Sequence, residues 1–314
     1  MYCLLIIIKK FGKQNLLLII LDCKFCCNVT IIYMPEYPEV TVVTNSLRKL
    51  VKNEKILKVE VLNPKFIHNT TVDDFVFSVT NKTILNVQNY GKFIEFDLSD
   101  KFRIFSHLRM AGKFYVYDYN QANLDKNNKH NYVYFYLSNN KVMIYNDARQ
   151  FGGFELIKND NTKTLVEIKK LAELPGKIDV DELYQKLQKK RISIKSVLLD
   201  QNLILGIGNI YADEALFAAN VYPMRKCNEV TKDELKTILE NAQKIMDESI
   251  KHGGSSVHTY QSVNSKQGTY QDKLKVYGKG EKKCPKCKDG FFKKVKLDFK
   301  ENGRGTTFCP ICQK

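Results

Sequence analysis

Several features that would assign a chain to a common class are missing from this sequence. No apolar run approaches the roughly 18 residues that a membrane-spanning helix needs, since the longest are Leu4–Ile8 and Leu16–Leu21. Acidic residues are in deficit, with 34 Asp and Glu against 50 Lys and Arg and a formal net charge of +16. No internal repeat of solenoid length is present. These absences disfavour a membrane protein, exclude an acidic solvating protein, and make polyanions the first class of partner to consider.

The nine cysteines are clustered, which argues against a disulfide framework spread over the chain. Four of them form two Cys-x-x-Cys pairs separated by 21 residues, namely Cys284, Cys287, Cys309 and Cys312. Four thiolates so placed can surround one tetrahedral zinc ion. The sequence therefore predicts one structural zinc ion per chain. A redox pair is the alternative, but it would explain neither the duplication nor the lysine-rich surroundings.

Periodicity divides the chain after Met34 into a strand-rich and a helix-rich half. Apolar residues at helical spacing predict a helix over Val40–Val51, with Pro38 in its first turn. Eight short stretches bounded by turn residues then predict the strands of a β-sandwich or barrel. These stretches are Ile56–Leu62, Thr83–Val87, Phe93–Leu98, Phe102–His107, Lys113–Tyr117, Tyr132–Leu137, Lys141–Tyr145 and Phe154–Ile157.

Helical spacing returns over Leu183–Leu199, Ile210–Ala219 and Leu235–Ile250. Thr231 followed by Glu234 predicts the start of the last helix. We therefore expect an α+β protein with five segments. These are a leader (1–33), an N-terminal β-sandwich domain (34–160), a linker region (161–179), a helical DNA-binding domain (180–272) and a zinc finger (273–314).

Two glycine-containing motifs in the second half predict particular local structures. Asn302-Gly303, between the cysteine pairs, predicts a tight hairpin turn that would place Arg304 at its tip. Gly206 and Gly208 precede a predicted helix, whose first backbone amides form a ready phosphate site. These two glycines do not make a dinucleotide-binding motif, because the third glycine of the pattern Gly-x-Gly-x-x-Gly is missing. On so basic a protein, we interpret the phosphate as that of a DNA backbone.

From Met34 to the end, the chain resembles the bacterial formamidopyrimidine-DNA glycosylases. The order of several separate motifs carries the resemblance. They are Pro35-Glu36-Tyr37-Pro38-Glu39-Val40, Gly91-Lys92, His107-Leu108-Arg109-Met110-Ala111-Gly112, Asp147-Ala148-Arg149-Gln150-Phe151-Gly152, Gly208-Asn209-Ile210-Tyr211-Ala212-Asp213-Glu214, Val276-Tyr277-Gly278 and the terminal cysteine pairs. One departure is the interval between the cysteine pairs, which is longer than in familiar members.

The resemblance implies an N-terminal β-sandwich flanked by helices, a helix–two-turn–helix domain and a four-cysteine zinc-finger β-hairpin. It implies a bifunctional DNA glycosylase and AP lyase of base-excision repair. Such an enzyme removes 8-oxoguanine and formamidopyrimidines from duplex DNA and cleaves the strand by β,δ-elimination. The expected partner is double-stranded DNA containing oxidised bases. We expect a cytoplasmic monomer with no membrane contact.

The resemblance also implies catalytic roles for four residues. Pro35, freed by removal of Met34, would be the nucleophile, and Glu36 the acid that helps open the sugar ring. Lys92 would act as general acid and phosphate ligand, and Arg304 would assist the second elimination. A secondary amine suits the reaction, because its iminium adduct cannot lose its charge by simple deprotonation.

Further residues match the DNA-binding set of the family. Met110, Arg149 and Phe151 would fill the gap that a flipped nucleotide leaves in the base stack. His130, Lys190 and Asn209 correspond to backbone-phosphate contacts, and Lys195 to another DNA-facing lysine. Glu39, His258 and the loop from Ser255 to Tyr270 match regions near the flipped base. For any single lysine, surface solubility is the alternative explanation.

Two other functions remain open at this stage. One is the related endonuclease VIII activity, which acts on oxidised pyrimidines with the same amine chemistry. The other is DNA binding without catalysis, which would follow if residues 1–33 were retained, because an amide nitrogen at Pro35 has no available lone pair. We therefore expect the active protein to lack residues 1–33, most simply because translation starts at Met34. We expect the leader to pack poorly against the domains, or to lie across the DNA-binding cleft if it is ordered.

Overall fold

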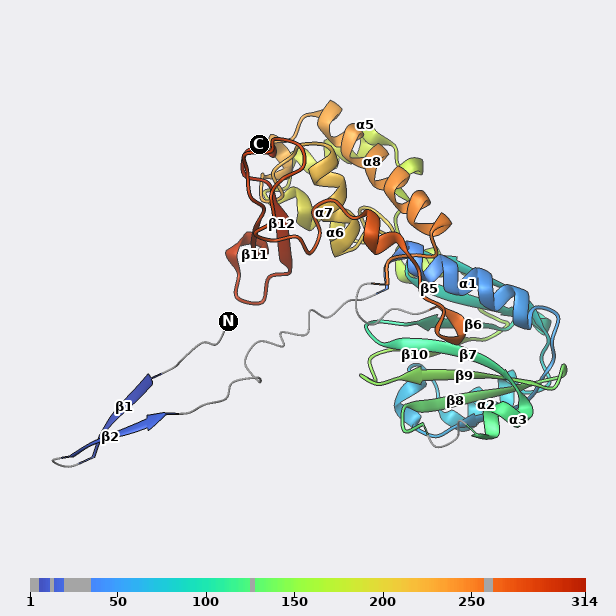
Figure 1. Cartoon of the computed structure of the whole chain (residues 1–314). Helices are drawn as coiled ribbons and strands as arrows, with labels where there is room; N and C mark the ends of the chain where they lie inside the picture. The colour runs from blue at the N-terminus through green and yellow to red at the C-terminus, as the bar shows by residue number, and fades with distance from the viewer. Residues whose placement is uncertain (1–5, 12–13, 20–34, 125–127, 257–261) are drawn as a thin grey trace. The chain divides into compact units, whose positions relative to one another are not determined.

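A computed structural model describes residues 6–11, 14–19, 35–124, 128–256 and 262–314. The chain divides into two compact units, Met1–Ile32 and Tyr33–Lys314 (Figure 1). In the first unit, β1 (Ile6–Phe11) pairs antiparallel with β2 (Gln14–Ile19). The sequence did not predict these strands, because their consecutive Leu and Ile residues show no alternation. Residues 20–34 lie outside the described ranges, so the expectation for the leader stays a prediction.

Two four-stranded antiparallel sheets form the sandwich that the sequence predicts (Figure 1). One sheet has the order β10-β6-β5-β4 and the other β3-β8-β9-β7. The first comprises β4 (Ile84–Tyr90), β5 (Phe93–Leu98), β6 (Arg103–His107) and β10 (Gly153–Ile157). The second comprises β3 (Ile56–Val61), β7 (Gly112–Asp118), β8 (Asn131–Leu137) and β9 (Lys141–Asp147). All eight predicted stretches thus form strands.

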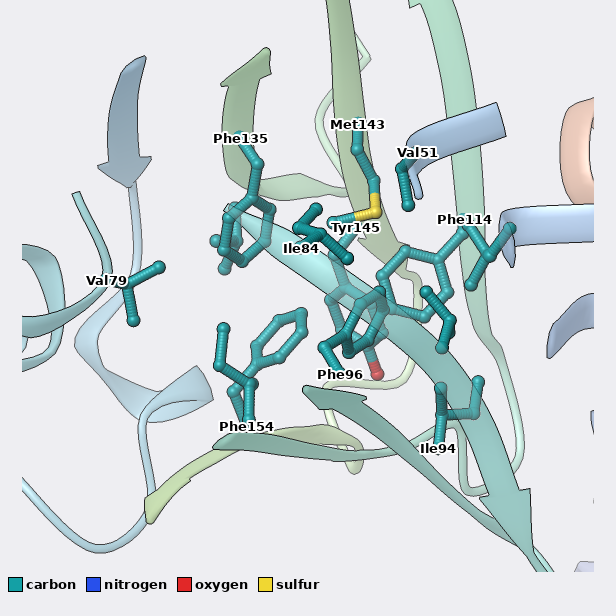
Figure 2. Close-up of a cluster of buried hydrophobic side chains, with 14 of the residues drawn as sticks. Val51, Val79, Ile84, Ile94, Phe96, Phe114, Phe135, Met143, Tyr145 and Phe154 are labelled. Carbon is teal, nitrogen blue, oxygen red and sulfur yellow. The ribbon is translucent and has the colours of Figure 1, made fainter. Parts of the chain in front are cut away.

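Aromatic rings from both sheets fill the space between them (Figure 2). Phe154 of β10 lies 6.1 Å from Phe114, 5.5 Å from Phe135 and 5.0 Å from Tyr145, measured between ring centroids. All four side chains are buried, and the rings meet at steep angles, which is a favourable geometry for aromatic pairs. This core supports the turns at the sheet ends, where several candidate site residues lie.

Three helices accompany the sandwich: α1 (Tyr37–Val51), α2 (Val72–Val79) and α3 (Tyr119–Leu124). The predicted first helix is confirmed as α1, with the apolar stripe Val40, Val43 and Leu47 buried. The sequence analysis missed the short α2, although Thr71 caps it by accepting a hydrogen bond from the Asp74 backbone.

The second half is helical, as predicted, and contains α4 (Leu165–Lys169), α5 (Val180–Gln188), α6 (Ile194–Leu199), α7 (Asn209–Ala218) and α8 (Lys232–Lys251). The single helical stretch expected over Leu183–Leu199 is two helices, because the Ser193 side chain caps a new helix at α6. The capping box of Thr231 and Glu234 is confirmed at the start of α8. Within the described ranges, no helix is long and apolar enough to cross a membrane.

The chain ends in a two-stranded hairpin of β11 (Lys293–Lys296) and β12 (Gly305–Phe308). The predicted position of the turn is wrong by one residue. The Gly303 amide donates to the Lys300 carbonyl oxygen, so Glu301 and Asn302 are the central residues. Arg304 therefore follows the turn directly before β12, where its carbonyl oxygen accepts from the Leu297 amide, and it is not at the tip.

Candidate active site

The Glu36 carboxylate lies against the N-terminus of α7. Its oxygens accept hydrogen bonds from the backbone amides of Gly208 at 2.9 Å and Ile210 at 2.8 Å. A Cβ on Gly208 would come within 2.3 Å of the Glu36 Cδ atom, so only glycine fits there. This contact corrects the prediction of a DNA phosphate at these amides, because a carboxylate of the protein itself occupies the helix N-terminus.

Burial brings the pKa values of Glu36 and Lys92 close to neutrality. It raises the pKa of Glu36 to about 7, although the positive charge of Lys92 opposes the shift. It lowers the pKa of Lys92 to about 8, with the Glu36 charge again opposing. The Lys92 ammonium donates to the carbonyl oxygen of Ile207 at 2.9 Å, one residue before the amides that Glu36 binds. Two groups that titrate near pH 7 are suited to proton transfer.

Glu39 holds the start of α1 in place through three hydrogen bonds. One carboxylate oxygen accepts from the Glu36 amide at 3.0 Å. The other accepts from the Tyr211 hydroxyl at 2.6 Å and the Ser255 amide at 2.8 Å. Burial raises the pKa of Glu39. Since Pro35 is itself buried and precedes Glu36, this network orients the backbone on which both predicted catalytic residues lie. His258 lies outside the described residues.

A pocket of about 290 Å³ opens beside this pair. It brings together Lys92 and Arg304, which are 212 residues apart in the sequence. Among the residues that the structure describes, no Asp or Glu lines it, so the lining favours an anion. The lining residues are Lys92, Phe93, His107, Arg109, Lys169, Leu171, Leu199, Gln201, Asn202, Gly208 and Arg304.

His107, Arg109, Lys169 and Gln201 were not predicted as site residues. The His107 Nδ1 atom accepts from the Arg109 amide at 2.9 Å. Burial, together with the charges of Arg109, Lys92 and Lys169, lowers the pKa of His107 to about 3, so the ring is neutral. His107 and Arg109 belong to the motif His107-Leu108-Arg109-Met110, so the sequence contained a signal for their place in the site. No motif of the sequence indicated Lys169 or Gln201.

Two neighbouring turns carry the three predicted wedge residues. Met110 lies in the turn between β6 and β7, and Arg149 and Phe151 lie in the turn between β9 and β10. Phe151 is 51% exposed, and the Arg149 guanidinium lies 5.2 Å from its ring centroid. A Cβ added at Gly112 or Gly152 would meet the Tyr145 hydroxyl at 2.5 and 2.0 Å, respectively. Both turns are therefore held close to the same side chain.

The buried Asp147 carboxylate organises the second of these turns. It accepts hydrogen bonds from four successive backbone amides, those of Arg149, Gln150, Phe151 and Gly152, at 2.9–3.0 Å. Such a set fixes the turn conformation, including the positive φ of Gln150 at 55°. The sequence analysis quoted Asp147 within a motif but gave it no role.

Lys195 is a correction to the predicted DNA-facing set. Its side chain is fully buried, and its ammonium forms an ion pair with Asp213 at 2.6 Å. It also donates to the Thr306 hydroxyl at 3.0 Å and the Gly305 carbonyl oxygen at 3.1 Å. The residue joins α6, α7 and β12, so it has no surface on which to meet a phosphate. Spacing alone could not distinguish this lysine from an exposed one.

The other three predicted phosphate contacts differ in their surroundings. Lys190 is exposed, and His130 is half-buried in the turn directly before β8. Asn209 begins α7, and its side-chain amide donates to the Gly305 carbonyl oxygen at 2.9 Å. These contacts neither require nor exclude DNA, so the roles of the three residues stay predictions.

The four cysteines of the finger converge on one point. Their sulfur atoms all lie within 4.8 Å of one another, and two Sγ–Sγ distances, Cys284–Cys312 and Cys287–Cys309, are 3.7 Å. A tetrahedral zinc with Zn–S bonds of about 2.3 Å requires edges of about 3.8 Å. The site therefore fits a metal ion of this kind. Buried Phe217 and Phe292 pack against it.

Comparisons with known proteins agree over most of the chain. The family model of the formamidopyrimidine-DNA glycosylase N-terminal domain matches residues 34–154, and that of its H2TH domain matches residues 172–261. A formamidopyrimidine-DNA glycosylase of Mycoplasma mobile is 40% identical over 281 residues, covering 90% of this chain and 99% of the relative. One of Listeria monocytogenes serotype 4b is 41% identical over 283 residues, covering 90% and 100%.

Solved structures show the same similarity. A mutant of Lactococcus lactis Fpg in complex with DNA containing Fapy-dG superposes with a TM-score of 0.81 and 34% identity, covering 89% of this chain and 100% of that one. The complex of Lactococcus lactis Fpg with DNA containing an abasic site gives a TM-score of 0.79 and 33% identity, with the same coverage.

Proposed function

The chain belongs to the formamidopyrimidine-DNA glycosylase family, and on that premise we propose that it excises oxidised purines from duplex DNA and cleaves the strand through the amine of Pro35. The observation that carries this proposal is the pair of buried groups formed by Glu36, which follows Pro35 in the chain, and Lys92. Glu36 and Lys92 both titrate near neutral pH and lie next to a pocket without acidic lining residues in the described chain.

The first step is attack of the neutral Pro35 amine on C1′ of the lesion nucleotide. The C1′–base bond breaks and a bond from nitrogen to C1′ forms, while the base leaves with a proton. An α-amino group has a pKa of about 7.7–8.0 in model peptides, so part of it is neutral at physiological pH. Opening of the sugar ring then breaks the C1′–O4′ bond. Glu36, whose pKa is about 7, supplies the proton that O4′ takes up.

The iminium ion formed at C1′ draws electrons from the sugar. Loss of a proton from C2′ expels the 3′ phosphate, and loss of a proton from C4′ in the opened sugar expels the 5′ phosphate. Both leaving groups are anions. Lys92 and Arg304, which meet at the pocket, would stabilise them by their positive charge.

Excision requires the lesion nucleotide to leave the base stack. Met110, Arg149 and Phe151, presented on two adjacent turns, would fill the gap that it leaves. The exposed Phe151 ring under the Arg149 guanidinium offers a flat surface to a neighbouring base. His130, Lys190 and Asn209 would contact backbone phosphates, and each such contact adds to affinity without reading sequence.

One zinc ion held by Cys284, Cys287, Cys309 and Cys312 would support the finger. The metal would supply structural stability, because few apolar side chains are available in the finger. Gly290 packs tightly here, since a Cβ would lie 3.0 Å from the Cys287 sulfur. Through β12 the finger places Arg304 at the pocket.

Borohydride trapping tests the proposal. The protein that begins at Pro35 is incubated with duplexes containing 8-oxoguanine, a formamidopyrimidine or an oxidised pyrimidine. We expect a covalent adduct with both purine lesions and a much smaller yield with the pyrimidine. The full chain, in which Pro35 is amide-bonded, serves as the matched control and should give none. Preferential trapping with the pyrimidine would favour the endonuclease VIII activity, and binding without any adduct would favour an inactive DNA-binding protein.

A further inference from the structure

Two of the cationic residues that line the pocket, Arg109 and Lys169, have no role in the proposed mechanism. Lys169 is the last residue of α4, the short helix in the segment that links the two halves of the second unit. A capping box of Thr164 and Glu167 begins this helix. Its Leu165 is buried against Phe105 and Ile157 of the sheet. The backbone that carries Lys169 is therefore firmly anchored.

The ammonium of Lys169 is held at the edge of the pocket. It donates to the two carboxylate oxygens of Glu155, in β10, at 2.7 and 2.6 Å. It also lies 5.7 Å from the centroid of the Phe93 ring. Its side chain stays 24% exposed. An ammonium has three N–H donors, so two bonds to Glu155 leave one donor for a ligand in the pocket.

The charges around the pocket exceed what Glu155 can balance. Lys92, Arg109, Lys169 and Arg304 all line it, whereas Glu155 pairs with Lys169 and the Glu36 charge offsets part of that of Lys92. A phosphodiester group is the anion that a DNA strand offers at such a place. Lys169 is thus suited to bind a phosphate, and Glu155 to fix the lysine where that phosphate would lie.

The same segment is bonded to the loop that holds the Glu36 site. The Ala172 amide donates to the Gln201 carbonyl oxygen at 3.0 Å. The Gln201 side-chain amide donates to the Ile207 carbonyl oxygen at 2.9 Å, and this oxygen also accepts from Lys92. A phosphate bound by Lys169 would therefore lie on a framework continuous with the predicted catalytic residues.

We infer that Lys169 binds a phosphodiester of the lesion-containing strand, with Glu155 as its positioning residue. This inference rests on the proposed function, since it requires the lesion strand to enter this pocket. It adds to that function a contact from the linking segment, which the motifs of the chain did not indicate.

The test measures binding of the full chain to a duplex with a tetrahydrofuran abasic analogue over a range of salt concentrations. Each phosphate contact contributes about 0.9 to the slope of log K against log salt. Lys169→Met should make the slope shallower by about that amount and weaken binding severalfold at about 0.1 M salt. Lys170→Met is the matched control, because it removes the same charge from an exposed neighbour outside the pocket lining. It should leave the slope unchanged.

The variant Glu155→Gln tests whether the Lys169–Glu155 ion pair only stabilises the fold or also positions Lys169 for phosphate binding. If Lys169 only supports the fold, Lys169→Met and Glu155→Gln should lower the melting temperature alike and leave the slope at its wild-type value. That result would overturn the inference. Equal slopes for Lys169→Met and Lys170→Met would overturn it too. Failure of the proposed function would instead be seen as an absence of borohydride adduct with the wild-type protein that begins at Pro35, whatever the slopes.

Discussion

Lys92 and Lys195 are both buried lysines whose pKa values are lowered by burial, yet they lie in two very different regions. Lys92 lines a pocket and donates to a backbone carbonyl oxygen. Lys195 is enclosed between α6, α7 and β12 and is paired with Asp213. Burial alone therefore does not distinguish the two lysines. Lys92 lines a cavity, whereas the Lys195 side chain has no exposed surface, and this difference is why we propose a catalytic role for Lys92 and a structural role for Lys195.

Loss of the finger metal should have the largest effect, because both regions depend on β12. Lys195 bonds to Gly305 and Thr306, and Arg304 lines the pocket of Lys92. We expect one zinc ion per purified chain, and Cys312→Ser should lose it together with binding to lesion DNA. Elemental analysis and a binding titration measure the two effects. Full metal content with unchanged binding would contradict the proposed role of the finger.

Lys92→Met should reduce strand cleavage at an 8-oxoguanine duplex by about 100- to 10,000-fold, the usual range for a general acid or base. The fold should tolerate the change, because methionine fills a similar volume and Glu36 can take up a proton near pH 7. Single-turnover kinetics measure the cleavage rate, and a melting curve measures the stability of the fold. A cleavage rate near that of the wild type would remove Lys92 from the mechanism.

Lys195→Met should show the opposite pattern, with a large loss of stability. Removing one partner of a buried ion pair costs about 3–5 kcal/mol. Adding Asp213→Asn should recover much of this loss, since the neutral amide still offers an acceptor for the Thr307 amide, which lies 3.0 Å from an Asp213 oxygen. Urea unfolding of both variants measures the free energy of unfolding. If Lys195→Met unfolds like the wild type, the ion pair has no structural role.

Titration of Glu36 should make the free energy of unfolding depend on pH, and this effect should be smaller than that of the preceding substitutions. Burial raises the pKa of Glu36 from 4.5 to about 7, so the folded state holds a proton that the unfolded state has released. Its contribution to stability is therefore complete below pH 4.5 and is lost as the pH rises through about 7. The loss should be on the order of 3 kcal/mol. Glu36→Gln should flatten this part of the stability profile and also abolish cleavage. Parallel profiles for the variant and the wild type would contradict the shift.

The fold was largely predictable from the sequence because its signals are local. Alternation along Phe93–Leu98 and turn residues on either side define a strand without reference to the rest of the chain. The capping box of α8 is equally local, since Thr231 and Glu234 are three residues apart. The cysteine pairs predicted a metal site, because spacing and ligand type suffice to specify one.

Other features depend on contacts between distant residues, and the sequence did not reveal them. Glu36 reaches the amides of α7 across 172 to 174 positions in the chain. Nothing near Lys195 shows that Asp213 and β12 will enclose it. Lys169 has no motif, and only packing of α4 on the sheet brings it to the pocket.

The sequence by itself therefore determined the eight strands of the sandwich, the longer helices, the four cysteines that converge on one point and, through the order of its motifs, the family. Only the tertiary structure decided which buried charges face a cavity and which are enclosed. The physical reason is that periodicity and capping act over a few residues. Desolvation and charge pairing, in contrast, depend on all the groups that folding brings around a side chain. Lys92 and Lys195 differ in the groups around them, since Lys92 lines a pocket and Lys195 is enclosed and paired with Asp213.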